Sequence, residues 1–178
     1  MKKLLGVGLV AAGTYIAFSG LDTPNFSLTK DPKTNIRLVK AASNKIFGIG
    51  IVANTAAAQA ILESNLYGKP SSLARNGNNL FGVKYNPKVD SNYITLGTSE
   101  CAGSICGKVV AKFAKYDSIL DSFKALNRLY NKANHRDVFK AKTCLEASTS
   151  LKKGGYATDP NYAQKVATIC VKIQKNLI

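Results

Sequence analysis

The sequence predicts one α+β domain that is mainly helical, and three observations lead to this expectation. Apolar residues recur at helical spacing before residue 66 and again after residue 118. Between these stretches the chain carries short runs of alternating apolar and polar residues, as strands do. The chain has 178 residues, a length at which one core rarely divides into two domains. Helices that flank a small sheet in this order are typical of α+β proteins.

Two helices are expected before the sheet. The first covers residues 36–47, where apolar side chains follow the three- and four-residue spacing of a helix face, and Gly48 ends it. The second covers residues 52–65, which are rich in alanine and contain neither glycine nor proline. Alanine has the highest helix propensity of all residues. We therefore expect the second helix to be the strongest in the chain, with Gly68 and Pro70 after it.

A small antiparallel sheet is expected next. Three alternating runs, at residues 80–85, 92–97 and 108–116, are separated by Asn-Pro, glycine and two cysteines. Such breaks are typical of turns between short strands. From residue 118 the apolar period becomes helical again, and the last helix is expected from residue 161 to the C-terminus.

The N-terminus predicts a hydrophobic helix over residues 1–21. Lys2 and Lys3 precede an uncharged stretch of about 18 apolar or small residues, close to the minimum that crosses a bilayer as a helix. The two lysines would hold this end in the cytoplasm and direct the rest of the chain outward. Ala17 and Ser19 are small enough for a signal peptidase site. A membrane anchor and a signal segment are therefore both open.

A spacer is expected between the hydrophobic segment and the folded domain. Residues 22–34 carry two prolines and polar side chains with no apolar period. This composition predicts irregular structure. The folded domain is accordingly expected to cover residues 35–178.

The charge balance indicates a polyanionic partner. Lys and Arg together number 25 against 10 Asp and Glu, which gives a formal net charge of +15. Only four of these cations are arginine, the residue best suited to reading bases and phosphates. Basic and aromatic residues do not interleave as they do in nucleic-acid-binding modules. We therefore expect no nucleic acid partner, and favour an acidic surface such as a bacterial envelope polymer.

Four cysteines indicate an oxidising compartment. Cys101, Cys106, Cys144 and Cys170 form an even set in a chain with an export signal, and three pairings are possible on paper. A 101–106 disulfide would staple a loop, and a 144–170 disulfide would tie two C-terminal helices. A zinc site is disfavoured because no CxxC unit exists and His135 is the only histidine. No metal and no other cofactor is expected.

Glu63 is the first candidate for chemistry. The three- and four-residue spacing places it on one helix face with Ala56, Gln59 and Ala60. Alanines let another helix approach closely, so the carboxyl group is expected to lose part of its water. It also lies near the negative end of the helix dipole, and both effects raise the pKa of a carboxyl group. A carboxylic acid that stays neutral near pH 7 is what protonation of a leaving glycosidic oxygen needs.

Five motifs occur in an order that resembles a known family. They are QAILES at residues 59–64, NNLFG at 78–82, TSE at 98–100, FAKYDS at 113–118 and GYATDPNY at 155–162. Together they resemble the glucosaminidase domain of glycoside hydrolase family 73, which comprises bacterial and phage peptidoglycan hydrolases. The resemblance covers residues 54–173. It implies a lysozyme-like fold with a small antiparallel β-lobe.

The resemblance also implies roles for single residues. Glu63 matches the family's general acid, Glu100 its second carboxylate on a mobile sheet lobe, and Tyr156 its tyrosine near the cleft. In these roles Glu63 would protonate the leaving oxygen and Glu100 would activate water, while Tyr156 would position the N-acetyl group or stabilise positive charge. The positions that match the family's substrate-binding residues are Asn79, Leu80, Phe81 and Tyr162. The activity implied is that of an endo-β-N-acetylglucosaminidase acting on peptidoglycan glycan strands.

One departure from the family pattern concerns Glu100. Cys101 follows it, where the family often has an aromatic residue, and a 101–106 disulfide would stiffen a lobe that is usually mobile. A lytic transglycosylase and a non-catalytic wall-binding or structural protein with the same fold remain as alternatives. The protein is expected outside the cytoplasm, held to the membrane by residues 1–21, or associated with a virion through the same segment.

Overall fold

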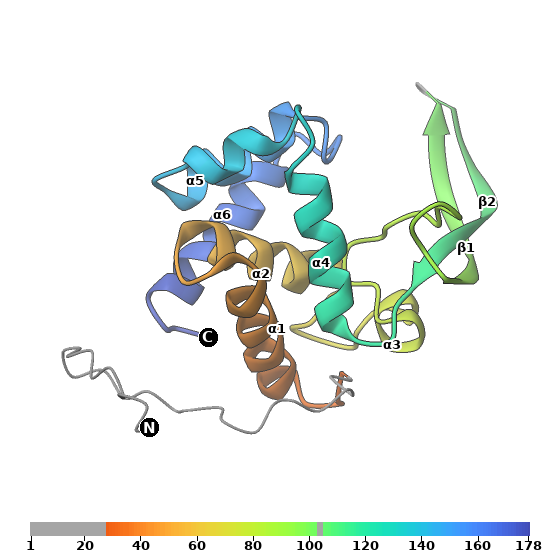
Figure 1. Cartoon of the computed structure of the whole chain (residues 1–178), viewed down its shortest axis with the longest axis horizontal. Coiled ribbons are helices and arrows are strands. Elements are labelled where there is room, and N and C mark those ends of the chain that lie inside the picture. The colour runs from red at the N-terminus through yellow and green to blue at the C-terminus, as the bar shows by residue number, and fades with distance from the viewer. Residues whose placement is uncertain (1–27, 103–104) are drawn as a thin grey trace, which may run out of the picture.

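The computed structural model describes residues 28–102 and 105–178, and their side chains except those of residues 99–106. The expectation of a mainly helical protein with a small antiparallel sheet is confirmed within these ranges (Figure 1). The elements follow one another as α1 (Pro32–Phe47), α2 (Ile51–Glu63), α3 (Ser72–Gly77), β1 (Asn92–Ala102), β2 (Ile105–Lys115), α4 (Ile119–Tyr130), the 3₁₀ helix η1 (Arg136–Lys140), α5 (Cys144–Lys153) and α6 (Tyr162–Gln174).

Helix α1 begins inside the segment expected to be a spacer. Asp31 caps it, because its carboxylate accepts hydrogen bonds from the backbone N–H groups of Lys33 (3.3 Å) and Thr34 (2.8 Å). Pro32 occupies the first helical position, where the missing N–H costs nothing and the fixed φ suits a helix. Proline, which suggested a spacer, here marks a helix start.

Helix α2 lies at the centre of the helical body. It packs against α1, α5 and α6, and Figure 1 shows it between α1 on one side and α5 and α6 on the other. Its buried face consists largely of alanines, which allow three neighbouring helices to approach the backbone closely. Ile61 is its large buried apolar side chain, and most of the others come from the rest of the fold and include Leu66, Phe123, Leu126, Tyr130, Leu151 and Val166.

The sheet has two strands in the described part of the chain. Strands β1 and β2 pair antiparallel from Asn92 opposite Lys115 to Ala102 opposite Ile105. Figure 1 shows them leaving the helical body as a ribbon. The buried residues of this ribbon, Phe113 and Ala114, lie near its base, whereas Val110 farther out is exposed.

The prediction of a third strand at residues 80–85 is wrong. Only a single bridge, between Lys84 and Phe113, joins this segment to β2. The Asn79 side chain takes over part of the hydrogen bonding that a strand would supply, accepting from Val83 N–H (3.0 Å) and donating to the Val83 and Ala114 carbonyl oxygens (2.9 and 2.8 Å). The segment therefore follows a loop around a buried amide.

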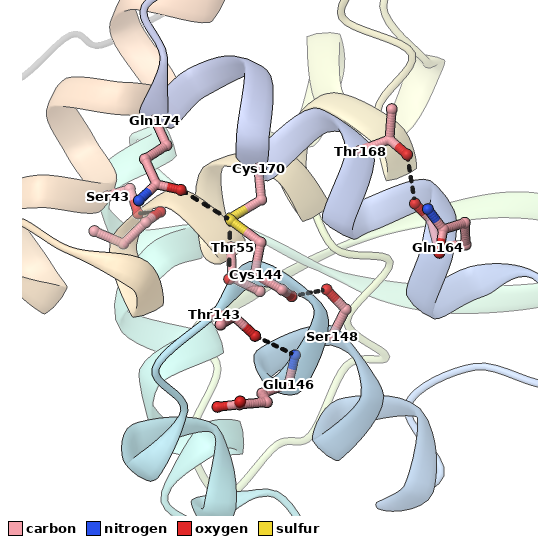
Figure 2. Close-up of a disulfide and its surroundings, with 11 residues drawn as sticks. Ser43, Thr55, Thr143, Cys144, Glu146, Ser148, Gln164, Thr168, Cys170 and Gln174 are labelled. Atoms are coloured by element: carbon pink, nitrogen blue, oxygen red, sulfur yellow. Dashed lines mark hydrogen bonds between the residues drawn. A yellow bond between two sulfur atoms is a disulfide. The ribbon is translucent and has the colours of Figure 1, made fainter.

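A disulfide between Cys144 and Cys170 joins the start of α5 to α6, as the sequence predicted (Figure 2). Both half-cystines are buried. The Thr55 hydroxyl of α2 lies 3.5 Å from Cys170 Sγ and supplies the hydrogen of this contact, because a disulfide sulfur has none. The cross-link thus sits where α5 and α6 meet the central helix.

The hydrophobic helix predicted at residues 1–21 lies outside the described residues. Across residues 28–102 and 105–178, the search for a helix of membrane-spanning length and hydropathy finds none.

Candidate active site

Glu63 is the last residue of α2, and the fold fixes this helix end. Ser64 follows, is buried, and donates its hydroxyl hydrogen to the Leu80 carbonyl oxygen (2.9 Å). Asn65 then adopts a left-handed conformation with φ 53°, which breaks the helix. The backbone that carries Glu63 is therefore tied on its C-terminal side to the segment that precedes the sheet.

The Glu63 carboxyl group has a raised pKa. Burial raises it above the usual 4.5, and a hydrogen bond from the Tyr162 hydroxyl lowers it only in part. Part of the side chain is open to solvent, yet the loss of water around the carboxyl group is the larger effect. The direction agrees with the expectation from the alanine-rich helix face.

Two tyrosines lie next to Glu63. Tyr162 begins α6 and stacks on Tyr156, with ring centroids 5.6 Å apart and planes 24° apart. Burial raises the pKa of both phenols well above the usual range; the negative charge of Glu63 adds to this for Tyr156, and interactions with Tyr156 and then Glu63 add to it for Tyr162. Both hydroxyls therefore stay protonated at neutral pH. The Tyr156 hydroxyl is buried and has no hydrogen-bond partner among the described residues.

A buried amide connects Tyr162 to the core. Gln59 lies one turn before Glu63 on α2 and donates from Nε2 to the Tyr162 hydroxyl at 2.7 Å. Its Oε1 accepts a short hydrogen bond from the Tyr130 hydroxyl of α4. Gln59, Tyr130 and Tyr162 are all buried. Three helices therefore meet in polar contacts directly beneath Glu63.

A cavity of about 570 Å³ lies beside Tyr156. Its walls are the loop before the sheet, one side of α4 with the residues after it, and the segment that carries Tyr156. The size is within the range of pockets that hold small ligands. The polar and charged side chains in its lining are Lys84, Asn86, Asp90, Arg128, Lys132, His135 and Tyr156, and Phe81 adds an aromatic ring.

His135 is a buried member of this lining that the sequence did not indicate as a site residue. Its ring packs edge-on against Tyr156, with centroids 6.2 Å apart. Burial lowers the pKa of the imidazole, and the nearby Lys132 charge adds to the effect, so the ring is neutral at pH 7. A Cβ at Gly154 would collide with the Asn134 carbonyl oxygen and with the His135 ring. The first glycine of the GGY motif thus allows this close packing.

The NNLFG motif divides between the interior and the cavity. Asn79 and Leu80 are buried, and the Asn79 amide forms hydrogen bonds with backbone groups. The Leu80 N–H is also occupied, since it donates to Ser122 Oγ at 3.0 Å. Phe81 lines the cavity and contacts Phe123 edge-on, with centroids 5.1 Å apart. The structure thus brings only Phe81 of these three to the cavity surface.

Glu100 lies on β1, where its backbone pairs with Gly107, two pairs before the last pair of the ribbon. Its side chain is outside what the structure describes, and so are those of Cys101 and Cys106. The register places Cys101 directly opposite Cys106. Their disulfide stays a prediction, as does the role of Glu100.

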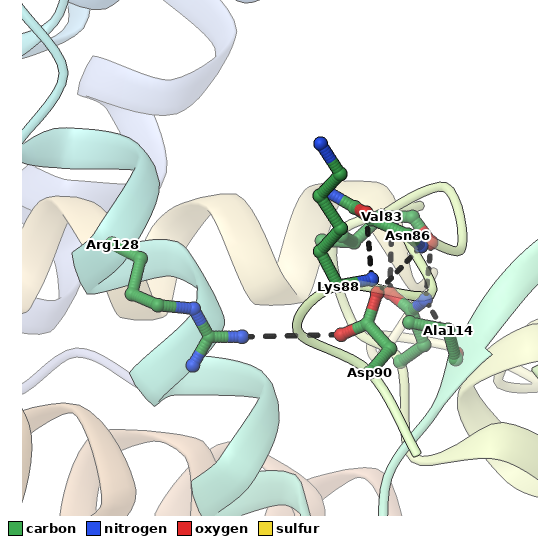
Figure 3. A network of polar contacts seen from close by, with 7 residues as sticks. Val83, Asn86, Lys88, Asp90, Ala114 and Arg128 are labelled. Carbon is green, nitrogen blue, oxygen red and sulfur yellow. Dashed lines mark hydrogen bonds and ion pairs between the residues drawn. The ribbon is translucent and has the colours of Figure 1, made fainter. Parts of the chain in front are cut away.

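A polar network that the sequence did not indicate holds the loop before the sheet against α4 (Figure 3). The Asp90 carboxylate accepts from Asn86 N–H at 2.8 Å and lies 4.0 Å from the Arg128 guanidinium. The Asn86 side chain in turn accepts from Lys88 N–H at 3.0 Å. An Asn-Pro pair is a turn signal in the sequence, but the contact with Arg128 joins positions too distant for local reasoning to find.

The described residues contain no group of three or more His, Cys, Asp or Glu side chains placed to hold a metal ion. Next to the Glu63 carboxyl group, the structure places the protonated hydroxyl groups of Tyr156 and Tyr162.

Comparison with known proteins identifies relatives. Residues 39–175 match the family model of the glucosaminidases, described as mannosyl-glycoprotein endo-beta-N-acetylglucosaminidase. The chain is 40% identical over 121 residues to the exo-glucosaminidase LytG of Bacillus subtilis, which covers 65% of this chain and 42% of LytG. It is 32% identical over 129 residues to the peptidoglycan hydrolase FlgJ of Salmonella typhimurium, covering 70% of this chain and 40% of FlgJ. The chain thus spans about two fifths of the length of these relatives.

Solved structures agree with the sequence comparison. The catalytic domain of the autolysin Auto from Listeria monocytogenes superposes with a TM-score of 0.64 at 30% identity, over 85% of this chain and 88% of that domain. The glycoside hydrolase domain of Salmonella typhimurium FlgJ superposes with a TM-score of 0.59 at 26% identity, over 83% of this chain and 91% of that domain. On its sequence and its fold, this chain belongs to the glucosaminidase family.

Proposed function

We propose that this protein hydrolyses peptidoglycan by cutting the glycan strand after N-acetylglucosamine, as an endo-β-N-acetylglucosaminidase with Glu63 as the general acid. The observation that carries the proposal is the Glu63 carboxyl group, whose pKa is raised by burial at the end of α2, next to two protonated tyrosines. Membership of the glucosaminidase family supports it, as do relatives named as a glucosaminidase and a peptidoglycan hydrolase.

The proposed reaction begins with proton transfer. Glu63 donates its proton to the glycosidic oxygen while the bond from that oxygen to the anomeric carbon breaks, and the downstream sugar leaves as an alcohol. Water then adds to the anomeric carbon and gives up a proton to a base. A carboxyl group whose pKa is raised holds its proton to a higher pH, which suits it to the first step.

Glu100 and Tyr156 are proposed to act on the anomeric centre. Glu100 would take the proton from water, or the substrate's own N-acetyl oxygen would assist the attack in its place. The Tyr156 hydroxyl is buried without a partner, so we infer that it donates to the N-acetyl group. Tyr162 would contribute through Glu63, because its hydroxyl hydrogen-bonds that carboxyl group.

The cavity beside Tyr156 is proposed to hold part of the glycan strand. Phe81 would offer its ring to a sugar face, since it lines this cavity. Asn79 and Leu80 are buried, so we infer that they serve substrate binding indirectly, by holding the Phe81 loop. The net charge of +15 would concentrate the protein on an acidic cell wall.

Action on peptidoglycan places the working domain outside the cytoplasm. We propose that residues 35–178, with the start of α1, form the catalytic domain, that residues 22–34 act as its link, and that residues 1–21 attach it to the membrane. Attachment to a virion through the same residues is the alternative. Fractionation of cells that make the full chain separates the two, because an anchored protein sediments with membranes and resists release by salt.

Mass spectrometry of fragments released from purified peptidoglycan by the full chain tests the activity. N-acetylglucosamine at the new reducing ends, absent with Glu63→Gln, would support the proposal. Long fragments early in the digestion would indicate endo cleavage, whereas single sugars from the start would indicate the exo mode named for LytG. The matched control is Glu146→Gln, which changes an exposed glutamate on α5 and should cut like the parent.

Two other outcomes of the digestion would contradict the proposal. Anhydro-muramyl ends would assign the protein to the lytic transglycosylases. No release by well-folded protein from walls of several types would leave a wall-binding protein that has kept the fold.

Residual cleavage by Glu100→Gln would favour assistance by the N-acetyl group.

A further inference from the structure

A row of hydrogen-bonding side chains leads from the core of the protein to Glu63. Tyr130 of α4 contacts Gln59 of α2, and Gln59 contacts Tyr162 of α6. The Tyr162 hydroxyl in turn acts on the Glu63 carboxyl group at the end of α2, where it lowers the pKa. Tyr130, Gln59 and Tyr162 are buried. The contacts join residues 71 and 103 positions apart in the sequence, so the row exists only in the folded protein.

The row has a direction, because each tyrosine hydroxyl has one hydrogen to give. Tyr130 donates its hydrogen to Gln59 Oε1, which leaves the amide nitrogen to face Tyr162. Gln59 Nε2 donates to the Tyr162 oxygen at 2.7 Å. Tyr162 therefore keeps its own hydrogen for the Glu63 carboxyl group. All hydrogens in the row are directed toward Glu63.

The reversed row is disfavoured by the burial of Tyr130. If the Gln59 amide were turned around, Nε2 would face Tyr130, and the Tyr162 hydroxyl would donate its hydrogen to Oε1. The Tyr130 hydrogen would then have no acceptor, since the described residues give it none except Gln59. A buried donor without a partner costs about 1–3 kcal/mol. The depth of Tyr130 thus selects the orientation in which Tyr162 donates to Glu63.

We propose that Tyr130 and Gln59 are positioning residues that make Tyr162 a hydrogen-bond donor to the Glu63 carboxyl group and so set the acid strength of the proposed general acid. The inference rests on the proposed function only in giving Glu63 a catalytic role. Burial alone favours the neutral carboxyl group, whereas a donated hydrogen bond favours the carboxylate. The row limits how weak an acid Glu63 becomes.

Few other groups compete with this row. The titratable groups that act on the Glu63 carboxyl group are Tyr162 at the start of α6 and Tyr156 in the segment before it. His135 packs against Tyr156 from the far side and is neutral. Within residues 28–102 and 105–178, the ion pairs found do not include Glu63. A change in the titration of Glu63 is therefore attributable to the row.

The test is a titration that does not depend on activity. The chain has three glutamates, at positions 63, 100 and 146, so glutamate labelled with ¹³C at the side-chain carboxyl gives three signals, and Glu63→Gln identifies one. The full chain in detergent is titrated as the parent and as Tyr162→Phe, Tyr130→Phe and Gln59→Met. Tyr130→Phe keeps the ring between Phe47 and Phe139, and Gln59→Met keeps the side-chain length.

We expect the Glu63 midpoint to rise in all three variants. Tyr162→Phe removes the donor itself and should raise it most, by about one unit, while Tyr130→Phe and Gln59→Met should raise it by about half a unit. The control is Tyr116→Phe, which removes another buried hydroxyl that has no partner and should leave the midpoint unchanged. An unmoved or lowered Glu63 midpoint in folded Tyr130→Phe and Gln59→Met would overturn the proposal.

Rate measurements separate this inference from the proposed function. A general acid must be protonated to act, so the alkaline limb of kcat against pH should move upward with the midpoint in each variant. A merely structural role of Tyr130 would lower the amount of folded protein without moving that limb. If the Glu63 titration midpoint moves but the alkaline limb of kcat does not, the positioning role of the row is supported and the proposal that Glu63 is the general acid is contradicted.

Discussion

The two glutamates proposed to act in the reaction lie in parts of the fold that hold them very differently. Glu63 ends a helix that three other helices pack against, and the hydroxyl of the buried Tyr162 acts on its carboxyl group. Glu100 stands on a two-stranded ribbon whose buried residues lie near its base. The helical body thus holds one carboxyl group in place in the absence of substrate, whereas the position of the other depends on how the ribbon meets the body.

This difference determines what the free protein shows about each of the two carboxyl groups. The Glu63 carboxyl group is recognisable in the free protein, because the partial loss of its water raises its pKa. The Glu100 side chain is outside what the structure describes, so its role stays a prediction. The predictions below change first the helical body, then the join between body and ribbon.

The largest effect is expected from Glu63→Gln. Loss of the proton donor should lower kcat on purified peptidoglycan by about 10²- to 10⁴-fold, the usual contribution of a general acid. Glu100→Gln should cost less, because N-acetyl assistance can replace its role. Release of reducing ends measures both. Equal losses in the two variants would mean that the ribbon carries as much of the chemistry as the helical body.

The same Glu63→Gln substitution should also change the pH dependence of stability. The folded pKa of Glu63 lies above the usual 4.5 that applies to the unfolded chain, so its contribution is fully present below that value. It is lost as the pH rises through the folded pKa. Urea unfolding should show Glu63→Gln gaining stability relative to the parent between pH 4 and pH 8. A constant difference across this range would contradict the raised pKa.

Removal of the Cys144–Cys170 disulfide is the next largest change. The bridge closes a loop over a sequence separation of 26, for which the loop-entropy model gives about 3–4 kcal/mol. Chemical denaturation of the double variant Cys144→Ala, Cys170→Ala, against the parent, measures the loss. Because the bridge lies beside α2 and away from Glu63, activity per folded molecule should persist. Its loss would show that the disulfide shapes the active site as well.

The helices were accessible to sequence reasoning because their signals are local. The alanine-rich run at residues 52–65 predicts α2 to within two residues at each end. The helical face that carries Glu63 also predicts the direction of its pKa shift. Both inferences use spacing along one element and the chemistry of its own residues.

Long-range polar contacts were not accessible in this way. Asn79 replaces an expected strand by a loop because its amide reaches Ala114, 35 positions away. The contacts of Gln59 with Tyr130 and Tyr162 arise only where three helices cross. A buried polar group is specified by its partners, and a single sequence does not show which distant residues those are. A sequence can therefore name candidate site residues, whereas the polar contacts that join them are found only in the fold.

Asn79→Ala tests the join between body and ribbon. It removes the donor to Val83 and Ala114 and leaves their buried backbone groups without it, which should cost about 2–3 kcal/mol. Hydrogen exchange should accelerate at residues 83 and 112–114 and remain slow in α2. The control is Asn131→Ala, on an exposed local contact, which should cost less than about 0.5 kcal/mol. Uniform acceleration would indicate global destabilisation instead of a loosened join.

Arg128→Gln should have the smallest effect, although Arg128 too connects the body to the loop before the ribbon. Its pair with Asp90 spans 4.0 Å, and the Arg128 side chain is 53% exposed while that of Asp90 is 3% exposed. The Asp90 side chain is buried, but the 4.0 Å separation and the exposed Arg128 side chain keep the pair weak, at about 1 kcal/mol. Asp90 also keeps its bond from Asn86 N–H.

Unfolding in low and high salt should therefore show a small loss for Arg128→Gln that salt removes. Lys124→Gln, which breaks a surface pair with Asp121, is the matched control. If Arg128→Gln instead cost as much as Asn79→Ala at every salt concentration, charge would hold the ribbon to the body. The reverse order, with the buried hydrogen bonds of Asn79 costing more to remove than the Arg128–Asp90 pair, is the one expected, because the Asn79 contacts are shielded from water and salt whereas the Arg128 side chain is not.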